Sequence, residues 1–245
     1  MERLPSISIV IPAYNEERRL PATLRSILDY LRARDWSSWE VIVVNDGSMD
    51  GTAAVAEQFG AAYSGVRLLQ NPGNRGKGYS VRHGMLEAEC DWVLFTDSDL
   101  SAPIEELDKL IAAANQRGAS VAIGSRAVDR RLIEVHQSWF RETAGRVFNL
   151  LMRVATGLPF ADTQCGFKLF ERGAAREIFR RQRIERWGFD AEVLFIARRL
   201  GYRSIEVPVR WSHSEGTKVS MFRDSVNMFL DLLRIRRNQL RGLYR

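Results

Sequence analysis

Short apolar runs alternate with segments of helical spacing through the first half of the chain. The apolar runs have the length of buried strands and lie at Ser8–Pro12, Val41–Val44, Val66–Leu69, Trp92–Phe95 and Val121–Ile123. Between them, apolar residues recur at helical intervals over 20–31, 55–59, 79–88 and 107–114. This alternation predicts an α/β fold, in which a mostly parallel sheet is covered by helices on both faces. Because ligands of such sheets bind beyond the carboxyl ends of the strands, the residues after each apolar run are the first candidates for a site.

The second half of the chain changes in character near Arg126, where arginines become frequent. Its pattern predicts helices over Trp139–Ala155 and Phe189–Leu200, a strand over Ile205–Trp211 and a terminal helix from about Met221. The sequence contains no internal repeat and no clear linker. We therefore expect one domain over residues 1–220, followed by a basic amphipathic helix over 221–245.

The composition and net charge limit the class of protein but do not identify its partner. The 245 residues carry a formal net charge of +6, which favours an anionic partner such as nucleic acid, phospholipid or a phosphorylated substrate. Cys90 and Cys165 lack metal-ligand spacing, so a zinc site or a disulfide framework is not expected. The first residues lack the pattern of a signal peptide, and no apolar run approaches the roughly 18 to 20 residues that span a bilayer. Any membrane contact is expected to be peripheral, at the cytoplasmic face.

Polar clusters follow the first two predicted strands. The first cluster begins at Pro12 and includes Tyr14 and Glu16, an aromatic ring beside a carboxylate that suits a nucleobase and ribose. The alternative without a ligand is that Pro12 ends the strand and that the polar residues are a solvated segment before the next helix. Asp46 follows the second strand and can accept hydrogen bonds from a base or ribose, although turn and helix-cap chemistry is the alternative for this loop.

A glycine-rich turn over 71–78 follows the third strand and opens a helix. Its backbone N–H groups and Lys77 suit a phosphate. The spacing differs from that of a P-loop and from the dinucleotide-binding fingerprint, which argues against an NTPase and a dehydrogenase.

Two carboxylates follow the fourth strand, at Asp97 and Asp99. Residues two apart in an extended segment point to the same side, so both carboxylates can converge on one cation. One or two carboxylates, completed by water and diphosphate oxygens, are typical ligands of Mg²⁺, and Mn²⁺ accepts similar ones. An isolated Asp-x-Asp is usually a solvated turn, but three further polar clusters at neighbouring strand ends favour a metal site here.

These motifs together resemble glycosyltransferase family 2, which has the GT-A fold. The resemblance rests on Val-Ile-Pro-Ala-Tyr-Asn-Glu, Val-Asn-Asp-Gly-Ser, Asn-Arg-Gly-Lys-Gly and Asp-x-Asp, in that order, and covers nearly the whole chain. Downstream stretches at 124–126, 162–170, 185–194 and 215–218 are similar to the dolichyl-phosphate β-glucosyltransferase branch in particular. Polyprenyl-phosphate mannosyltransferases are similar but slightly further away.

The resemblance implies roles for individual residues. The nucleotide would be held by Pro12, Ala13, Tyr14, Glu16, Asp46, Lys77, Asp97 and Ser98. The metal, Mg²⁺ or Mn²⁺, would be held by Asp99 with Asp97. Ser101 stands where the mannosyltransferase branch has a glutamine that helps to bind the metal, and serine is a weaker ligand. The catalytic residues would be Asp97, Asp99, Arg126, Lys218 and Asp190, with Arg126 and Lys218 facing phosphates.

Asp190 and its neighbours also have structural interpretations. Asp190 is equally suited to be a first-turn helix acid, and it is retained as a sugar or acceptor contact through the resemblance alone. Trp187 and Phe189 are interpreted as core residues slightly in preference to a wall against the sugar.

The activity implied by the resemblance is an inverting transfer of a hexose, with glucose from UDP-glucose favoured, onto a polyprenyl or dolichyl phosphate. The competing hypotheses are a GDP-mannose-dependent mannosyltransferase and a non-catalytic nucleotide-sugar-binding protein, although the latter would usually lack the intact acidic pair. Nucleic acid is not an expected partner, because carboxylates occupy the predicted ligand edge. The apolar stripe Phe222, Val226, Phe229 and Leu233, followed by arginines, predicts docking on a membrane surface, with packing on the domain as the alternative.

Overall fold

The first strand lies inside the main sheet. The computed structural model describes residues 3–135, 149–150, 152–213 and 221–245, without the side chains of 134 and 221–226. Strand β1 (Ile7–Ala13) pairs in parallel with β2 on one side and β4 on the other. The seven strands follow the order β3-β2-β1-β4-β7-β5-β8. The other strands of this sheet are β2 (Trp39–Asn45), β3 (Val66–Gln70), β4 (Trp92–Thr96), β5 (Val121–Ser125), β7 (Phe167–Glu171) and β8 (Ser204–Pro208).

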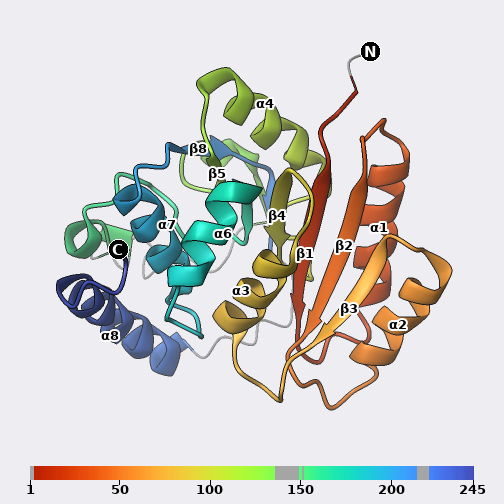
Figure 1. Ribbon diagram of the computed structural model, residues 1–245, viewed down its shortest axis with the longest axis horizontal. Coiled ribbons are helices and arrows are strands. Elements are labelled where there is room, and N and C mark those ends of the chain that lie inside the picture. Colours follow the sequence, from red (N-terminus) through yellow and green to blue (C-terminus); the bar gives the residue numbers. More distant parts are fainter. Residues whose placement is uncertain (1–2, 136–148, 151, 214–220) are drawn as a thin grey trace.

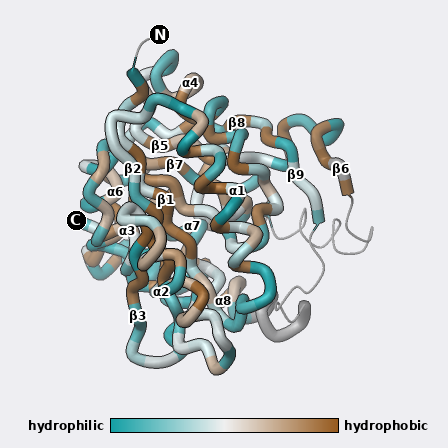
Figure 2. Tube along the Cα trace, turned by 90° about the vertical axis from the view of Figure 1, so that its right-hand side faces the viewer, coloured by the Kyte–Doolittle hydropathy of each residue, from teal (hydrophilic) through white to brown (hydrophobic). Residues whose placement is uncertain are grey.

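Helices cover both faces of this sheet (Figure 1). One face packs on α1 (Leu20–Arg32), α2 (Thr52–Ala62) and α4 (Leu107–Arg117). The other packs on α3 (Lys77–Glu87), α6 (Arg172–Arg181) and α7 (Phe189–Arg199). The apolar residues gather in the inner strands and polar ones in the outer helices and loops (Figure 2). Alternate residues of β1 point to opposite faces, so Ile9 belongs to the first core cluster and Val10 to the second. The predicted α/β architecture, with five strands and their connecting helices, is confirmed.

Strand β7 is the main departure from a parallel sheet. It lies between β4 and β5 and is antiparallel to both. The apolar run of this strand is interrupted by Lys168, which is fully buried. The sequence pattern therefore did not predict a strand over Phe167–Glu171.

The predicted strand Ile205–Trp211 is wrong in its extent. Strand β8 ends at Pro208, and Trp211–Ser212 forms β9, which pairs with β6 (Ile133–Val135) in a separate two-stranded sheet. Proline has no N–H to donate to a sheet, which fits the end of β8 at this residue. Most of the predicted helix Trp139–Ala155 lies outside the described residues, and 152–156 are helical.

The predicted terminal helix is present as α8 (Met221–Leu240). Its inner face packs beside α7 through Leu232 and Ile235, which are buried. Beyond the helix, the Tyr244 hydroxyl donates to Glu192 Oε1 of α7 at 2.5 Å. In the described part of the chain, no helix is both long and apolar enough to cross a bilayer.

Candidate functional site

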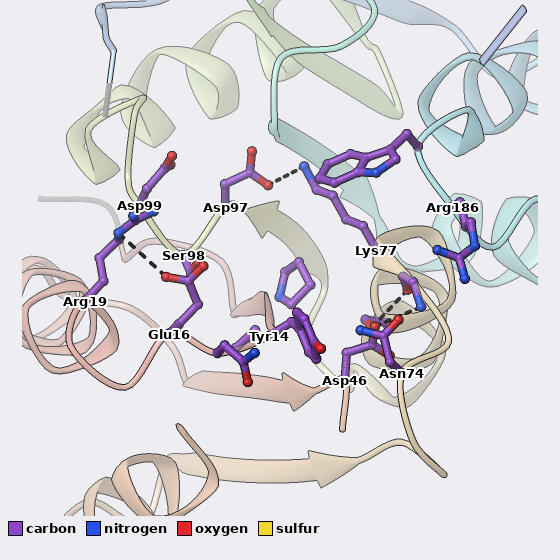
Figure 3. Close-up of a pocket in the computed structure, with 16 residues that line it drawn as sticks. Tyr14, Glu16, Arg19, Asp46, Asn74, Lys77, Asp97, Ser98, Asp99 and Arg186 are labelled. Atoms are coloured by element: carbon purple, nitrogen blue, oxygen red, sulfur yellow. Dashed lines mark hydrogen bonds and ion pairs between the residues drawn. The ribbon is translucent and has the colours of Figure 1, made fainter. Parts of the chain in front are cut away.

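A cavity of about 720 Å³ opens at the carboxyl ends of β1, β2 and β4 (Figure 3). Its lining contains every residue that the strand ends and the resemblance together assign to nucleotide or metal binding: Pro12, Ala13, Tyr14, Glu16, Asp46, Lys77, Asp97, Ser98 and Asp99. These residues come from four separate segments of the chain. The parallel arrangement brings them together because it places the ends of these strands at one edge.

Asp46 organises the glycine-rich turn. Its Oδ1 accepts hydrogen bonds from the Asn71 side-chain amide at 2.8 Å and from the Arg75 backbone N–H at 2.9 Å, and its Oδ2 accepts one from the Gly76 N–H at 2.8 Å. The carboxylate is 4% exposed. Asp46 therefore fixes the turn that leads into α3, whatever contact it makes with a ligand.

Gly76 lets a second loop close on this turn. Its φ is +105°, a region that side chains disfavour, and a Cβ there would lie 2.7 Å from the Glu185 carbonyl oxygen. The Tyr79 N–H donates to the same carbonyl at 2.9 Å. This contact brings Arg186 and Trp187 to the wall of the cavity.

Lys77 and Asp97 form an ion pair inside the cavity. Lys77 Nζ lies 2.6 Å from Asp97 Oδ1 (Figure 3). Burial lowers the pKa of Lys77, but Asp97 and Asp190 outweigh it and the pKa is raised, so the ammonium stays charged. Behind Asp97, a Cβ on Gly166 would lie 2.0 Å from Asp97 Oδ2, so only glycine fits at 166 with this carboxylate position.

Asp99 is the second carboxylate at the end of β4. Its Oδ1 accepts a hydrogen bond from the Ser101 N–H at 3.0 Å. Across the described residues, no three His, Cys, Asp or Glu side chains gather as a self-sufficient metal site. A Mg²⁺-type ion needs fewer protein ligands, because it keeps several waters and binds through one or two carboxylates plus substrate phosphates. Asp97 and Asp99 fit such an ion.

Asp190, at the start of α7, forms an ion pair with the buried Lys168. Lys168 Nζ donates to Asp190 Oδ1 at 2.5 Å and to the Cys165 carbonyl oxygen at 2.6 Å. Burial raises the pKa of Asp190, and the charges of Lys168 and Lys77 oppose that rise. Asp190 is absent from the cavity lining but interacts electrostatically with Lys77 and Asp97.

Arg126 is also outside the cavity lining. Its Nε and Nη2 donate to the two oxygens of Asp162 at 2.7 and 2.8 Å, and its guanidinium lies 5.4 Å from the centre of the Trp211 ring. Burial alone would raise the pKa of Asp162, but Arg126 lowers it to about 2, so the pair is fully charged. Lys218 lies outside the described residues, and its role stays a prediction.

Several lining residues were not predicted from the sequence. They are Asn15, Arg19, Asn74, Gly76, Ser80, Arg186 and Trp187. Asn15, Asn74 and Gly76 belong to the motifs already singled out, so the motif positions could have indicated them. Arg19 and Ser80 lie just beyond two of these motifs, at the starts of α1 and α3. Arg186 and Trp187 reach the cavity only through packing on the glycine-rich turn. The interpretation of Trp187 as core is wrong, because the ring is only partly buried, whereas Phe189 is in the core.

The model of Glycosyl transferase family 2 matches residues 8–179. This is more than half of the chain, and the chain belongs to glycosyl transferase family 2. The enzyme class is hexosyltransferase.

Particular relatives are similar over most of the chain. The dolichyl-phosphate beta-glucosyltransferase of Drosophila melanogaster is 39% identical over 100% of this chain and 79% of its own length. The dolichyl-phosphate beta-glucosyltransferase of Saccharomyces cerevisiae is 36% identical over 98% of this chain and 76% of its own. Among solved structures, glucosyl-3-phosphoglycerate synthase from Mycobacterium tuberculosis, in complex with Mn²⁺, UDP-glucose and phosphoglyceric acid, has a TM-score of 0.67 at 21% identity, covering 94% of this chain and 79% of that one. This last likeness confirms the predicted GT-A fold.

Proposed function

We propose that this hexosyltransferase transfers glucose from UDP-glucose to a polyprenyl phosphate of the dolichyl type, with inversion at the anomeric carbon. The observation that carries the proposal is the single cavity in which Asp97, Asp99 and Lys77 meet the turn that Asp46 organises. It offers carboxylates for a metal and a cation for a diphosphate within one lining. The names of the relatives support the donor sugar and the lipid acceptor.

Each part of the cavity has a task in holding the donor. Tyr14 and Glu16 suit the nucleobase and ribose, and Lys77 suits the diphosphate. Before the donor enters, Asp97 holds Lys77 inside the cavity. A Mg²⁺ or Mn²⁺ ion held by Asp97 and Asp99 would act as a Lewis acid toward the departing diphosphate.

The acceptor requires little proton transfer. The second pKa of a phosphate monoester is about 6, so the acceptor is largely anionic at neutral pH and needs no general base. One acceptor oxygen forms a bond to the anomeric carbon while the bond from that carbon to the diphosphate breaks, and UDP leaves with the electron pair. Two phosphate-bearing substrates repel each other. Fixed cations suit the task of offsetting that repulsion. Lys77 lies in the cavity, and the resemblance adds Arg126 and Lys218.

A panel of donors tests the proposed reaction. With polyprenyl phosphate as acceptor, we expect UDP-glucose to give lipid-linked sugar with a kcat/KM at least roughly a hundredfold above that of GDP-mannose, because an unmatched base leaves buried polar groups unpaired. The measurement is extraction and quantification of the lipid-linked product. A preference for GDP-mannose would contradict the proposed donor, and UDP binding without transfer would contradict the activity.

An Asp46→Ala variant provides the control for donor binding in that panel. It should bind UDP about tenfold or more weakly, since two backbone N–H groups of the turn lose their acceptor. Asp50→Ala is the matched change, because Asp50 is in the same loop but outside the cavity lining.

Docking on a membrane surface is part of the same proposal, because the acceptor is held in a bilayer. The supporting surface lies on α8, where Phe229, Leu233 and Leu240 are 45%, 55% and 89% exposed. The Arg236 guanidinium donates to the Ala155 carbonyl oxygen, which places the exposed Leu150 and Val154 segment beside the helix. We call Leu150, Val154, Phe229, Leu233 and Leu240 the apolar surface.

Arginines next to the apolar surface provide charge complementarity with anionic lipids. Arg153, Arg236 and Arg241 are exposed and lie near it in the sequence. Each basic residue near an anionic membrane contributes on the order of 1 kcal/mol, and the apolar side chains add burial in the interface. In the described part of the predicted stripe, Phe229 and Leu233 are about half exposed, whereas Leu232 and Ile235 on the opposite face of the helix are buried. Truncation at Arg234 would remove buried residues, so point substitutions are the sharper test.

We expect a Phe229→Gln/Leu233→Gln variant to sediment with anionic vesicles roughly tenfold less strongly, because two apolar side chains no longer enter the interface. Its UDP affinity should be unchanged. Met49→Gln is the control, since Met49 is 85% exposed in the loop between β2 and α2, on the other side of Figure 1 from α8. Equal loss of sedimentation in both variants, or in neither, would contradict docking through the apolar surface.

A further inference from the structure

A second cavity, of about 570 Å³, lies between the loop 183–187 and α8. Its lining consists of Arg183, Ile184, Glu185, Arg186, Trp187, Asn227, Met228, Asp231, Arg234, Arg237 and Asn238. We call it the arginine cavity. Arg186 and Trp187 line both this cavity and the donor cavity, so one loop separates the two.

The lining of the arginine cavity has an excess of positive charge. It contains four arginines and two carboxylates. Both carboxylates are already engaged: Glu185 pairs with Arg75 at 3.0 Å, and Asp231 pairs with Arg234 at 2.8 Å. Asp231 also accepts a hydrogen bond from the Gly188 N–H, which ties α8 to the loop.

Three arginines of the cavity have no such partner. Arg183, Arg186 and Arg237 form no ion pair with any described residue, and all three are exposed to solvent. They come from two elements that face each other, the loop and α8. Three unpaired guanidinium groups around one hollow raise the local positive potential and favour an anion.

We propose that the arginine cavity binds the phosphate group of a phosphate ester, at a site distinct from the donor diphosphate. Guanidinium groups bind phosphate oxygens through paired N–H donors, and the side-chain amides of Asn227 and Asn238 add further donors in the same lining. The volume lies in the range of small-ligand sites and exceeds what a bare phosphate needs, so there is room for a group such as glycerol on the ester. The headgroup of an anionic lipid and a free phosphate ester share this chemistry.

The two cavities share Arg186 and Trp187 and differ in their other cationic side chains. Arg19 and Lys77 line only the donor cavity, whereas Arg183, Arg234 and Arg237 line only the arginine cavity. The shared loop packs closely against the glycine-rich turn, where a Cβ on Gly78 would lie 2.7 Å from the Ile184 carbonyl oxygen. Substitutions at Arg183 and Arg237 therefore change one site without touching the other. The inference goes beyond the proposed function and does not depend on it.

Calorimetric titration of the full chain with glycerol phosphate tests the inference. An Arg183→Gln/Arg237→Gln variant should bind glycerol phosphate about tenfold or more weakly than the parent, because two charge-assisted contacts are lost. A Lys77→Gln variant should retain this binding. The matched control is Arg176→Gln/Arg199→Gln, which removes the same charge from exposed positions on α6 and α7 outside both cavities.

Vesicles distinguish the two sources of the phosphate. If the ligand is a lipid headgroup, the cavity variant should lose affinity for phosphatidylcholine vesicles containing phosphatidylglycerol by about tenfold relative to the matched control. If only glycerol phosphate responds, the ligand is a free ester. The inference is overturned if neither probe distinguishes the cavity variant from its control, or if Lys77→Gln abolishes binding while the cavity variant retains it. A parallel UDP titration reports on the proposed function separately.

Discussion

An Asp99→Asn variant is expected to keep its fold and to lose hexosyl transfer by roughly a thousandfold or more. Asp99 lines the donor cavity, and its carboxylate makes only one hydrogen bond among those described, to the Ser101 N–H, which an asparagine oxygen can also accept. The expected loss corresponds to about 4 kcal/mol of transition-state stabilisation, within the several kcal/mol that a Lewis-acid metal supplies. The measurement is product formation over a series of Mn²⁺ concentrations, together with the melting temperature.

Asp29→Asn is the matched control for Asp99→Asn, because Asp29 is an exposed carboxylate on α1, away from the cavity lining. It should retain the parent rate. Asp97→Asn would be harder to interpret, since it also releases Lys77 from its ion pair. Parent-like transfer by Asp99→Asn, or transfer that is indifferent to a chelator in the parent, would contradict the assignment of a metal to this pair.

A Lys168→Met variant is expected to lower the free energy of unfolding at neutral pH by about 3–5 kcal/mol, because it leaves a buried carboxylate without its counter-charge. Lys168 is 0% exposed and bonds Asp190 at 2.5 Å. For a chain of this size, the change corresponds to a melting temperature lower by roughly 10 °C. Denaturant unfolding monitored by circular dichroism measures it.

The pH dependence of the Lys168→Met variant separates charge from packing. Burial already raises the pKa of Asp190, and loss of Lys168 raises it further. A folded-state pKa above the unfolded value means that the folded state binds the proton more tightly, so the variant should regain stability relative to the parent as the pH falls toward 5.

Two further variants complete this test. Lys168→Met/Asp190→Asn should recover part of the loss at neutral pH. Lys109→Met is the matched control, because Lys109 is 47% exposed and its partner Glu106 keeps a second ion pair with Arg210. Equal destabilisation by the two lysine substitutions would show that the burial of the Lys168 pair is unimportant.

The N-terminal part of the fold could be predicted because its information is local. Each strand from β1 to β5 is an apolar run flanked by polar turns, and each connecting helix has its own apolar stripe. Strand β7 could not be predicted in the same way. Its central Lys168 is neutralised by Asp190, which is 22 residues further along the chain, and its position between β4 and β5 depends on pairings far apart in sequence. Helix α6 was also missed, since its arginines obscured the buried stripe of Ala174, Ile178 and Phe179.

The candidate site also contains residues that local sequence signals predicted and residues that only tertiary packing brings together. Residues at strand ends were predicted to meet, because the edge of a parallel sheet dictates their proximity. Partners formed by tertiary packing were not, and these include Asp162 beside Arg126 and Lys168 beside Asp190. Trp187 was misinterpreted for the same reason, since an aromatic residue near a helix start carries no local sign of the cavity it lines.

The position of β7 has a consequence for biosynthesis. Strand β4 ends at Thr96 and β7 ends at Glu171, so the ribosome completes β4 75 residues before it completes β7. At about 5–20 residues per second, the nascent chain spends roughly 4 to 15 seconds with one edge of β4 unpaired. The apolar sequence of this strand, Trp-Val-Leu-Phe-Thr, is then an open template for pairing with other chains. Completion of the sheet thus waits on a late segment, and β4 stays open to pairing with other chains until β7 has been synthesised.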